Sequence, residues 1–171
     1  EELVAEAKRL VKSGVKEIML IAQELTYYGL DLYKKRALPD PLHALADIDG
    51  LHWIRLHYAY PSKFPLEIID VMKERENICN YLDMPLQHAS DAMLLAMKRQ
   101  ITRAEMKELI GEIRTRIPDI CLRTTLIAGF PGETRDDVEE VKSFLEEHRF
   151  DRMGIFTYSH EEDTSAHELI D

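Results

Sequence analysis

The chain has 171 residues, 45% of them hydrophobic, which is enough for one compact domain with a buried core. Its net charge of −10 argues against unaided binding to nucleic acid, because such binding depends on lysine and arginine neutralising phosphates. No stretch reaches the roughly 18 consecutive apolar residues of a membrane span, and no secretory signal opens the sequence. We therefore expect one cytoplasmic domain with no membrane partner and no direct nucleic-acid binding.

Helical and strand patterns alternate along the first half. Apolar residues at helical spacing begin at Leu3, and Ser13-Gly14 ends that helix near residue 13. The apolar run 18–22 predicts a strand covered on both faces. The loop at 27–35 carries three tyrosines and has the length of a functional lid. Beyond it, the pattern predicts a helix through Leu42 and Leu45, a strand over 53–58, a helix over 66–75 and a strand over 81–87.

The second half adds two helices, over 90–99 and from Thr102, where Glu105 has the spacing of a capping box. The remaining elements are a strand over 120–129, a helix capped by Thr134 that runs to about 147, and a strand over 153–158. Such alternation implies right-handed crossovers and a parallel sheet. Five strands are visible, whereas a complete eight-stranded barrel typically takes about 250 residues. The pattern alone therefore fits either an open doubly wound sheet or an incomplete barrel.

Ligands of parallel α/β folds bind where the carboxyl ends of the strands meet. Polar residues predicted at those ends are Gln23, Glu24, His57, Tyr58, Tyr60, Gln87, His88, Tyr158, Ser159 and His160. The carboxamide of Gln87 can both donate and accept, which suits a ribose or an amino-acid group. The histidines lie in different elements without a cysteine or carboxylate at ligand spacing, so no metal site is predicted. Cys79 and Cys121 lie in apolar runs and are expected to be buried free thiols.

Residues 123–134, RTTLIAGFPGET, form the most informative segment. Gly129 lacks a side chain where a flat ligand would approach the backbone, and Pro131-Gly132 suits a tight turn before a helix. Arg123 and Thr125 are two residues apart, so they share one face of the strand and can offer a cation and a hydroxyl to a ligand. An ordinary strand-to-helix turn with a salt bridge at Arg123 explains the same residues without a ligand.

The segment IAGFPGET at 127–134 resembles the glycine-bearing fifth strand of radical S-adenosylmethionine methylthiotransferases. Four other segments are similar to the RimO branch of that family: IAQELTYYG at 21–29, RLHYAYP at 55–61, YLDMPLQH at 81–88 and FTYSHEE at 156–162. The related MiaB branch usually has arginine in place of the acidic pair after the last strand. The resemblance runs through nearly the whole chain, in family order.

This resemblance implies an α/β fold, an incomplete parallel βα barrel that lacks the first strand and the cluster loop. Residues 1–171 would form the radical SAM catalytic core, without the family's CxxxCxxC loop, its N-terminal methylthiotransferase domain or its C-terminal TRAM domain. The chain opens at Glu1 rather than methionine, and we expect it to be a fragment that is inactive alone and retains no cofactor. The intact enzyme would use S-adenosylmethionine and two four-iron four-sulfur clusters.

The implied reaction adds a methylthio group to the β-carbon of an aspartate in a small-subunit ribosomal protein, taken alone or within the assembled small subunit. The family motifs predict cofactor contacts from Gln23, Gln87, Arg123, Thr125, Ile127 and Gly129. They predict substrate contacts from His57, Tyr58, Tyr158, His160 and Glu161. No catalytic residue and no metal ligand is assigned.

Three alternative functions use the same residues. A MiaB-like enzyme would modify an adenosine of transfer RNA, and a non-catalytic relative would use the barrel as a binding module. A cluster-independent lyase or hydrolase would need an acid–base pair at the strand ends. The ordered series of motifs favours the methylthiotransferase. The acidic run Glu161–Asp163 is expected to be a solvated loop or a docking surface for a basic partner.

Overall fold

The computed structural model describes residues 2–162, 166 and 169, in which five parallel strands form one sheet. The strands are β1 (Glu17–Ile21), β2 (Trp53–His57), β3 (Ile78–Asp83), β4 (Cys121–Ala128) and β5 (Arg152–Thr157), and they lie side by side in chain order. A doubly wound sheet requires a point at which the strand order reverses. The unbroken order therefore selects the incomplete βα barrel.

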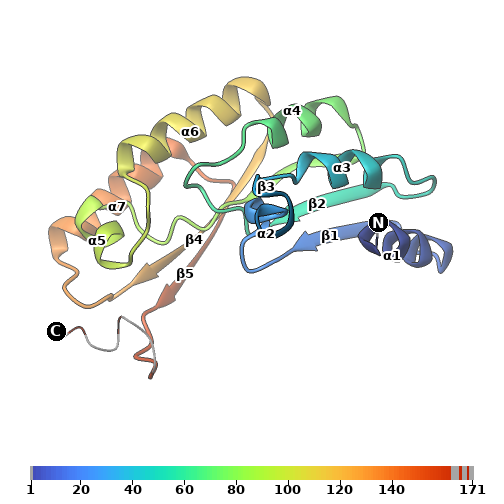
Figure 1. Ribbon diagram of the computed structural model, residues 1–171. Helices are drawn as coiled ribbons and strands as arrows, with labels where there is room; N and C mark the ends of the chain where they lie inside the picture. The colour runs from blue at the N-terminus through green and yellow to red at the C-terminus, as the bar shows by residue number, and fades with distance from the viewer. Residues whose placement is uncertain (1, 163–165, 167–168, 170–171) are drawn as a thin grey trace.

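Helices cover one face of this sheet. They are α1 (Glu2–Lys12), α2 (Leu30–Tyr33), α3 (Pro39–Ala46), α4 (Glu67–Glu74), α5 (Asp91–Ala96), α6 (Arg103–Arg116) and α7 (Arg135–His148), with the 3-10 turn η1 at Leu25–Tyr27. Figure 1 shows α3, α4, α6 and α7 along the same side of the strands. Strand residues on this side, such as Ile54, Leu56 and Leu82, are buried and supply the hydrophobic core. No described helix is both long and apolar enough to cross a membrane.

The opposite face, called here the inner face, is open at β1. The prediction that residues 18–22 are covered on both sides is wrong: Leu20 is buried, but Met19 and Ile21 are 49% and 67% exposed. Successive side chains of a strand alternate between faces, so these two point away from the helices. Cys79 and Cys121 also alternate with core residues and are half-buried free thiols rather than fully buried ones.

The third strand differs from its prediction at both ends. It begins at Ile78 instead of Tyr81 and ends at Asp83 instead of Gln87. Pro85 has no N–H to donate to a strand ladder, which explains the early end. Gln87 returns to the sheet through an isolated bridge to Leu126 of β4, so its backbone stays next to the glycine-bearing strand.

Candidate functional site

A cleft of about 540 Å³ lies on the inner face near the carboxyl ends of the strands. Seven of the eleven residues predicted to contact cofactor or substrate line it: His57, Tyr58, Gln87, Arg123, Thr125, Ile127 and Tyr158. The volume lies within the range of small-molecule sites, about 300–1,000 Å³. The parallel register explains the convergence, because residues at equivalent positions of neighbouring strands share one face.

The backbone turns through the left-handed region at three strand ends around the cleft. The φ angles are +66° at Tyr58, +70° at Gln87 and +76° at Gly129. Left-handed non-glycine residues are uncommon and tend to gather at functional sites. At Gly129 a β-carbon would meet no atom within 4 Å, so the glycine is required by its φ and leaves open space beside the strand end.

Polar and charged side chains form a row across the inner face. Asp83 pairs in register with Arg123, which pairs in turn with Arg152, and His57 occupies the corresponding position of β2. The Asp83 side chain is only 2% exposed. One of its oxygens, Oδ2, lies 3.1 Å from His57 Nδ1, and the other, Oδ1, lies 3.2 Å from Arg123 Nη1. The predicted salt bridge at Arg123 therefore exists and is itself part of the cleft.

Two buried polar atoms of cleft residues make no hydrogen bond within the described part of the chain: Asp83 Oδ1 and the hydroxyl of Tyr158. The guanidinium of Arg123 is close to Asp83 Oδ1, but its N–H groups do not point at that oxygen. Leaving a buried polar atom without a partner costs free energy. The Tyr158 hydroxyl marks a place where a polar ligand can supply the missing hydrogen bond, whereas Asp83 Oδ1 can gain one from a reoriented Arg123.

Glu133, which the sequence did not single out as a separate site residue, fixes the turn after β4. Its Oε2 accepts a hydrogen bond of 2.7 Å from the backbone N–H of Gly129, and its Oε1 lies 3.0 Å from His88 Nε2. His88 Nδ1 accepts from the N–H of Ser90, so Nε2 is the protonated nitrogen and donates to Glu133. His88 is fully buried and has a structural role.

Other polar residues predicted at the strand ends are structural as well. Glu24 accepts from the N–H groups of Thr26 and Tyr60 and from the Thr26 hydroxyl, which joins the loops after β1 and β2. The Tyr60 ring lies under Arg99, whose guanidinium donates to the Pro85 carbonyl at 2.8 Å. Burial lowers the pKa of Arg99.

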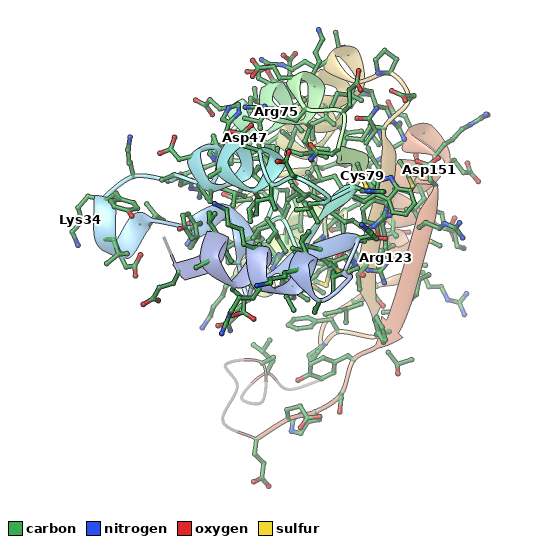
Figure 2. The ribbon with its side chains drawn as sticks, turned by 90° about the vertical axis from the view of Figure 1, so that its right-hand side faces the viewer. Lys34, Asp47, Arg75, Cys79, Arg123 and Asp151 are labelled. Atoms are coloured by element: carbon green, nitrogen blue, oxygen red, sulfur yellow. The ribbon has the colours of Figure 1, made fainter. Side chains whose placement is uncertain are left out.

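The predicted loop at 27–35, which carries three tyrosines, folds into part of η1 and into α2 and does not line the cleft. Figure 2 shows Lys34, at the end of α2, far across the molecule from Arg123. No described contact supports the lid that the loop length suggested.

Four predicted residues lie outside the cleft lining: Gln23, Gly129, His160 and Glu161. Gln23 is exposed just after β1, and Gly129 forms the turn beside the cleft. The His160 ring lies edge-on to Tyr158 at 6.4 Å, and Glu161 accepts a hydrogen bond from the Ser159 hydroxyl. Asp163, the last residue of the predicted acidic run, lies outside the described residues.

Four lining residues were not singled out from the sequence: Asp83, Pro85, Phe156 and Thr157. Ser159, which was predicted at the end of the last strand, also lines the cleft. A signal existed for Asp83, because it is an ionisable residue inside the apolar run Tyr81–Leu86. A buried charge in such a run needs a partner, and partners gather at functional sites.

The lining of the cleft is suited to an adenosyl group. The described residues are less suited to holding an iron–sulfur cluster. Ile127, Pro85 and Phe156 offer apolar surface, while Gln87 and Thr125 offer hydrogen bonds to a ribose or a base. Within residues 2–162, 166 and 169, no three His, Cys, Asp or Glu side chains are grouped to hold a metal ion. Burial raises the pKa of both Cys79 and Cys121, which disfavours the thiolate form that metals bind.

Comparison with known proteins gives consistent matches. The model of the Radical SAM superfamily matches residues 1–145. A protein of Flavobacterium psychrophilum named ribosomal protein uS12 methylthiotransferase RimO is 57% identical over all 171 residues, which cover 40% of that protein. A protein of the same name from Bacteroides fragilis is 55% identical over 97% of this chain and 38% of its own length. The chain thus spans about 40% of the length of these relatives.

A solved structure shares the fold. Coproporphyrinogen III oxidase (HemN) from Escherichia coli, described as a radical SAM enzyme, superimposes with a TM-score of 0.71 over 99% of this chain and 40% of its own chain. The sequence identity is 17%, so this likeness concerns the fold alone.

Proposed function

Because the chain belongs to the Radical SAM superfamily, we propose that the full-length protein is a methylthiotransferase that modifies the β-carbon of an aspartate in ribosomal protein uS12. The observation that carries this proposal is the 57% identity to a uS12 methylthiotransferase along the entire chain, which includes every residue of the cleft. The relatives' shared name favours a ribosomal protein over transfer RNA as the substrate. The protein would act in the cytoplasm on uS12, free or within the small subunit.

The 171 residues would form the catalytic core, with an N-terminal methylthiotransferase domain and a C-terminal TRAM domain in the remaining length. Membership of the superfamily implies S-adenosylmethionine and iron–sulfur chemistry in the intact enzyme. We propose two four-iron four-sulfur clusters, held by residues other than those described. S-adenosylmethionine bound at the cluster would supply the radical chemistry, and this chain would position the reacting groups.

Residues of β4 and of the segment that follows β3 would hold the cofactor. Gln87 and Thr125 offer polar contacts to its ribose and base, Arg123 offers a cation to its carboxylate, and Ile127 offers an apolar surface. Gly129 and Gln23 would border the same site from the ends of β4 and β1. The Glu133 carboxylate stabilises this arrangement by holding the Gly129 turn.

The substrate would enter from the ends of β2 and β5, where His57, Tyr58, Tyr158, His160 and Glu161 lie. Although the chain carries a net charge of −10, the inner-face row has two arginines, Arg123 and Arg152, and one aspartate, Asp83. A local positive charge of this kind favours an acidic target side chain. The overall negative charge favours a basic protein that carries it.

Mass spectrometry of uS12 tests the proposal. A strain that lacks the gene should have uS12 without the methylthio group, and the full-length gene, but not a vector control, should restore it. Transfer RNA from the same strain should keep its methylthioadenosine. Loss of the modification from transfer RNA, with uS12 unchanged, would instead support the MiaB-like function.

A further inference from the structure

Asp83 lies at the centre of the charged row, between the His57 imidazole and the Arg123 guanidinium. Its side chain is 2% exposed, with His57 Nδ1 and Arg123 Nη1 at 3.1 and 3.2 Å. A carboxylate so deeply buried is costly unless opposite charges remain close to it. Movement of Arg123 away from the strand would leave this charge without compensation. Asp83 therefore restrains a guanidinium that is itself 32% exposed and would otherwise be free to move.

Arg152 makes this restraint more important. It pairs in register with Arg123 on the neighbouring strand β5, so two guanidinium groups start from adjacent positions on one face. Like charges directly opposite each other in a sheet repel. Without the negative charge of Asp83, this repulsion would displace Arg123 from its place in the cleft.

The contacts of Asp83 also leave room for adjustment when a ligand binds. Oδ1 makes no hydrogen bond within the described residues, although Arg123 is at contact distance. Polar groups of active sites are often misaligned before the ligand binds and become aligned in the complex. A ligand carboxylate that engages the outer N–H groups of Arg123 would turn the inner ones toward Asp83.

We propose that Asp83 is a positioning residue, which acts through Arg123 to hold the guanidinium where a ligand carboxylate binds. The proposal rests on the proposed function, in which that carboxylate belongs either to S-adenosylmethionine or to the target aspartate. Asp83 touches neither ligand in this scheme, and its effect passes entirely through the side chain beside it.

A double-mutant cycle on the full-length, cluster-loaded enzyme tests this role, with affinity for S-adenosylmethionine measured by equilibrium dialysis. We expect Asp83→Asn and Arg123→Gln each to weaken binding, Asp83→Asn by about tenfold, the low end for residues that orient a ligand-binding group. The double variant should bind no more weakly than Arg123→Gln alone, because the aspartate then has no guanidinium to hold. The affinity for a uS12 peptide is measured in the same way to distinguish the carboxylate of S-adenosylmethionine from that of the target aspartate. Only the ligand whose carboxylate Arg123 binds should lose affinity in these variants.

The control is Asp70→Asn, which removes an ion pair of 2.7 Å between Asp70 and Arg116 on the outer helices. This variant should leave the affinities for both ligands unchanged. Two results would overturn the proposal. One is an equal loss of affinity when Asp83→Asn is introduced into the wild type and into Arg123→Gln. The other is an unchanged affinity of either single variant for both ligands. If Asp83→Asn loses its cluster or its melting transition, the same cycle is run with Asp83→Glu, which keeps the charge but moves it. A wild-type enzyme that binds no S-adenosylmethionine would overturn the proposed function, and this inference with it.

Discussion

The Glu133 side chain fixes two turns at the rim of the cleft. Its carboxylate accepts from both the Gly129 backbone and His88, and these two contacts join the turns after β3 and β4. The sequence predicted the turn but not this role, because residues four and forty-five positions away come together only in the folded chain. The same limit explains why Glu24 was expected at the ligand site.

Replacement of Glu133 by glutamine should destabilise the chain. The amide can accept from one N–H but presents donors to His88, whose other nitrogen is already occupied by Ser90. We expect a loss of about 1–3 kcal/mol in the free energy of unfolding, the cost of a buried donor left unsatisfied. Urea unfolding measures it. Glu139→Gln, on the exposed side of α7, is the control and should change little; equal effects of the two variants would contradict the assigned role.

The two cysteines should react slowly with iodoacetamide at neutral pH. Burial raises the pKa of both thiols, so the fraction of the reactive thiolate is smaller than for a free cysteine. The alkylation rate, followed by mass spectrometry of the native chain, should rise as the pH rises and should reach that of free cysteine only after unfolding. A native rate above that of free cysteine would contradict this.

At the scale of elements, the strand-to-helix turns link the cleft to the helical layer. Ser90, before α5, donates to Asp137 in the first turn of α7, and Asp137 completes the capping box with Thr134. The sequence predicted both helix caps, since capping depends on residues three apart. Pro85 was a local sign that the third strand ends before residue 87, but the bridge from Gln87 to β4 depends on the neighbouring strand and could not be predicted.

Removal of a helix cap should affect binding only where the helix begins at the cleft. Thr134→Ala and Thr102→Ala should each cost about 1 kcal/mol of stability, because each removes an N-cap. Only Thr134 lies next to the Gly129–Glu133 turn, so only that variant should weaken S-adenosylmethionine binding to the full-length enzyme. Melting temperatures and equilibrium dialysis separate the two effects; equally weakened binding in both variants would show that the turn is not coupled to the site.

The link between Ser90 and Asp137 should depend on pH. Hydrogen bonds from Ser90 first, and then from Thr134, hold the pKa of Asp137 below its ordinary value. Their stabilisation is therefore present above that ordinary value and is lost as the pH falls through the lower pKa of the folded state. Ser90→Ala should cost about 1.5–3 kcal/mol near pH 6, as for hydrogen bonds to charged groups, and the difference from wild type should shrink below about pH 4. A difference that is independent of pH would contradict this assignment.

At the scale of the whole molecule, alternating patterns predicted five parallel strands, and the structure confirms them. Periodicity could not decide between a doubly wound sheet and an incomplete barrel, because both contain the same units; the strand order β1-β2-β3-β4-β5 decides it. The exposure of Met19 and Ile21 could not be predicted either, since an apolar run does not say which faces are covered. Seven of eleven predicted site residues converge in one cleft because strand ends of a parallel barrel meet on one side.

We propose that this cleft holds the adenosyl group of S-adenosylmethionine. A crystal structure of the full-length, cluster-loaded protein with S-adenosylmethionine tests it most directly. We expect the adenosyl group to lie on the inner face, in contact with Gln87, Thr125 and Ile127, beside the Gly129 turn. An adenosyl group bound elsewhere, with solvent between Gln87 and Thr125, would contradict it.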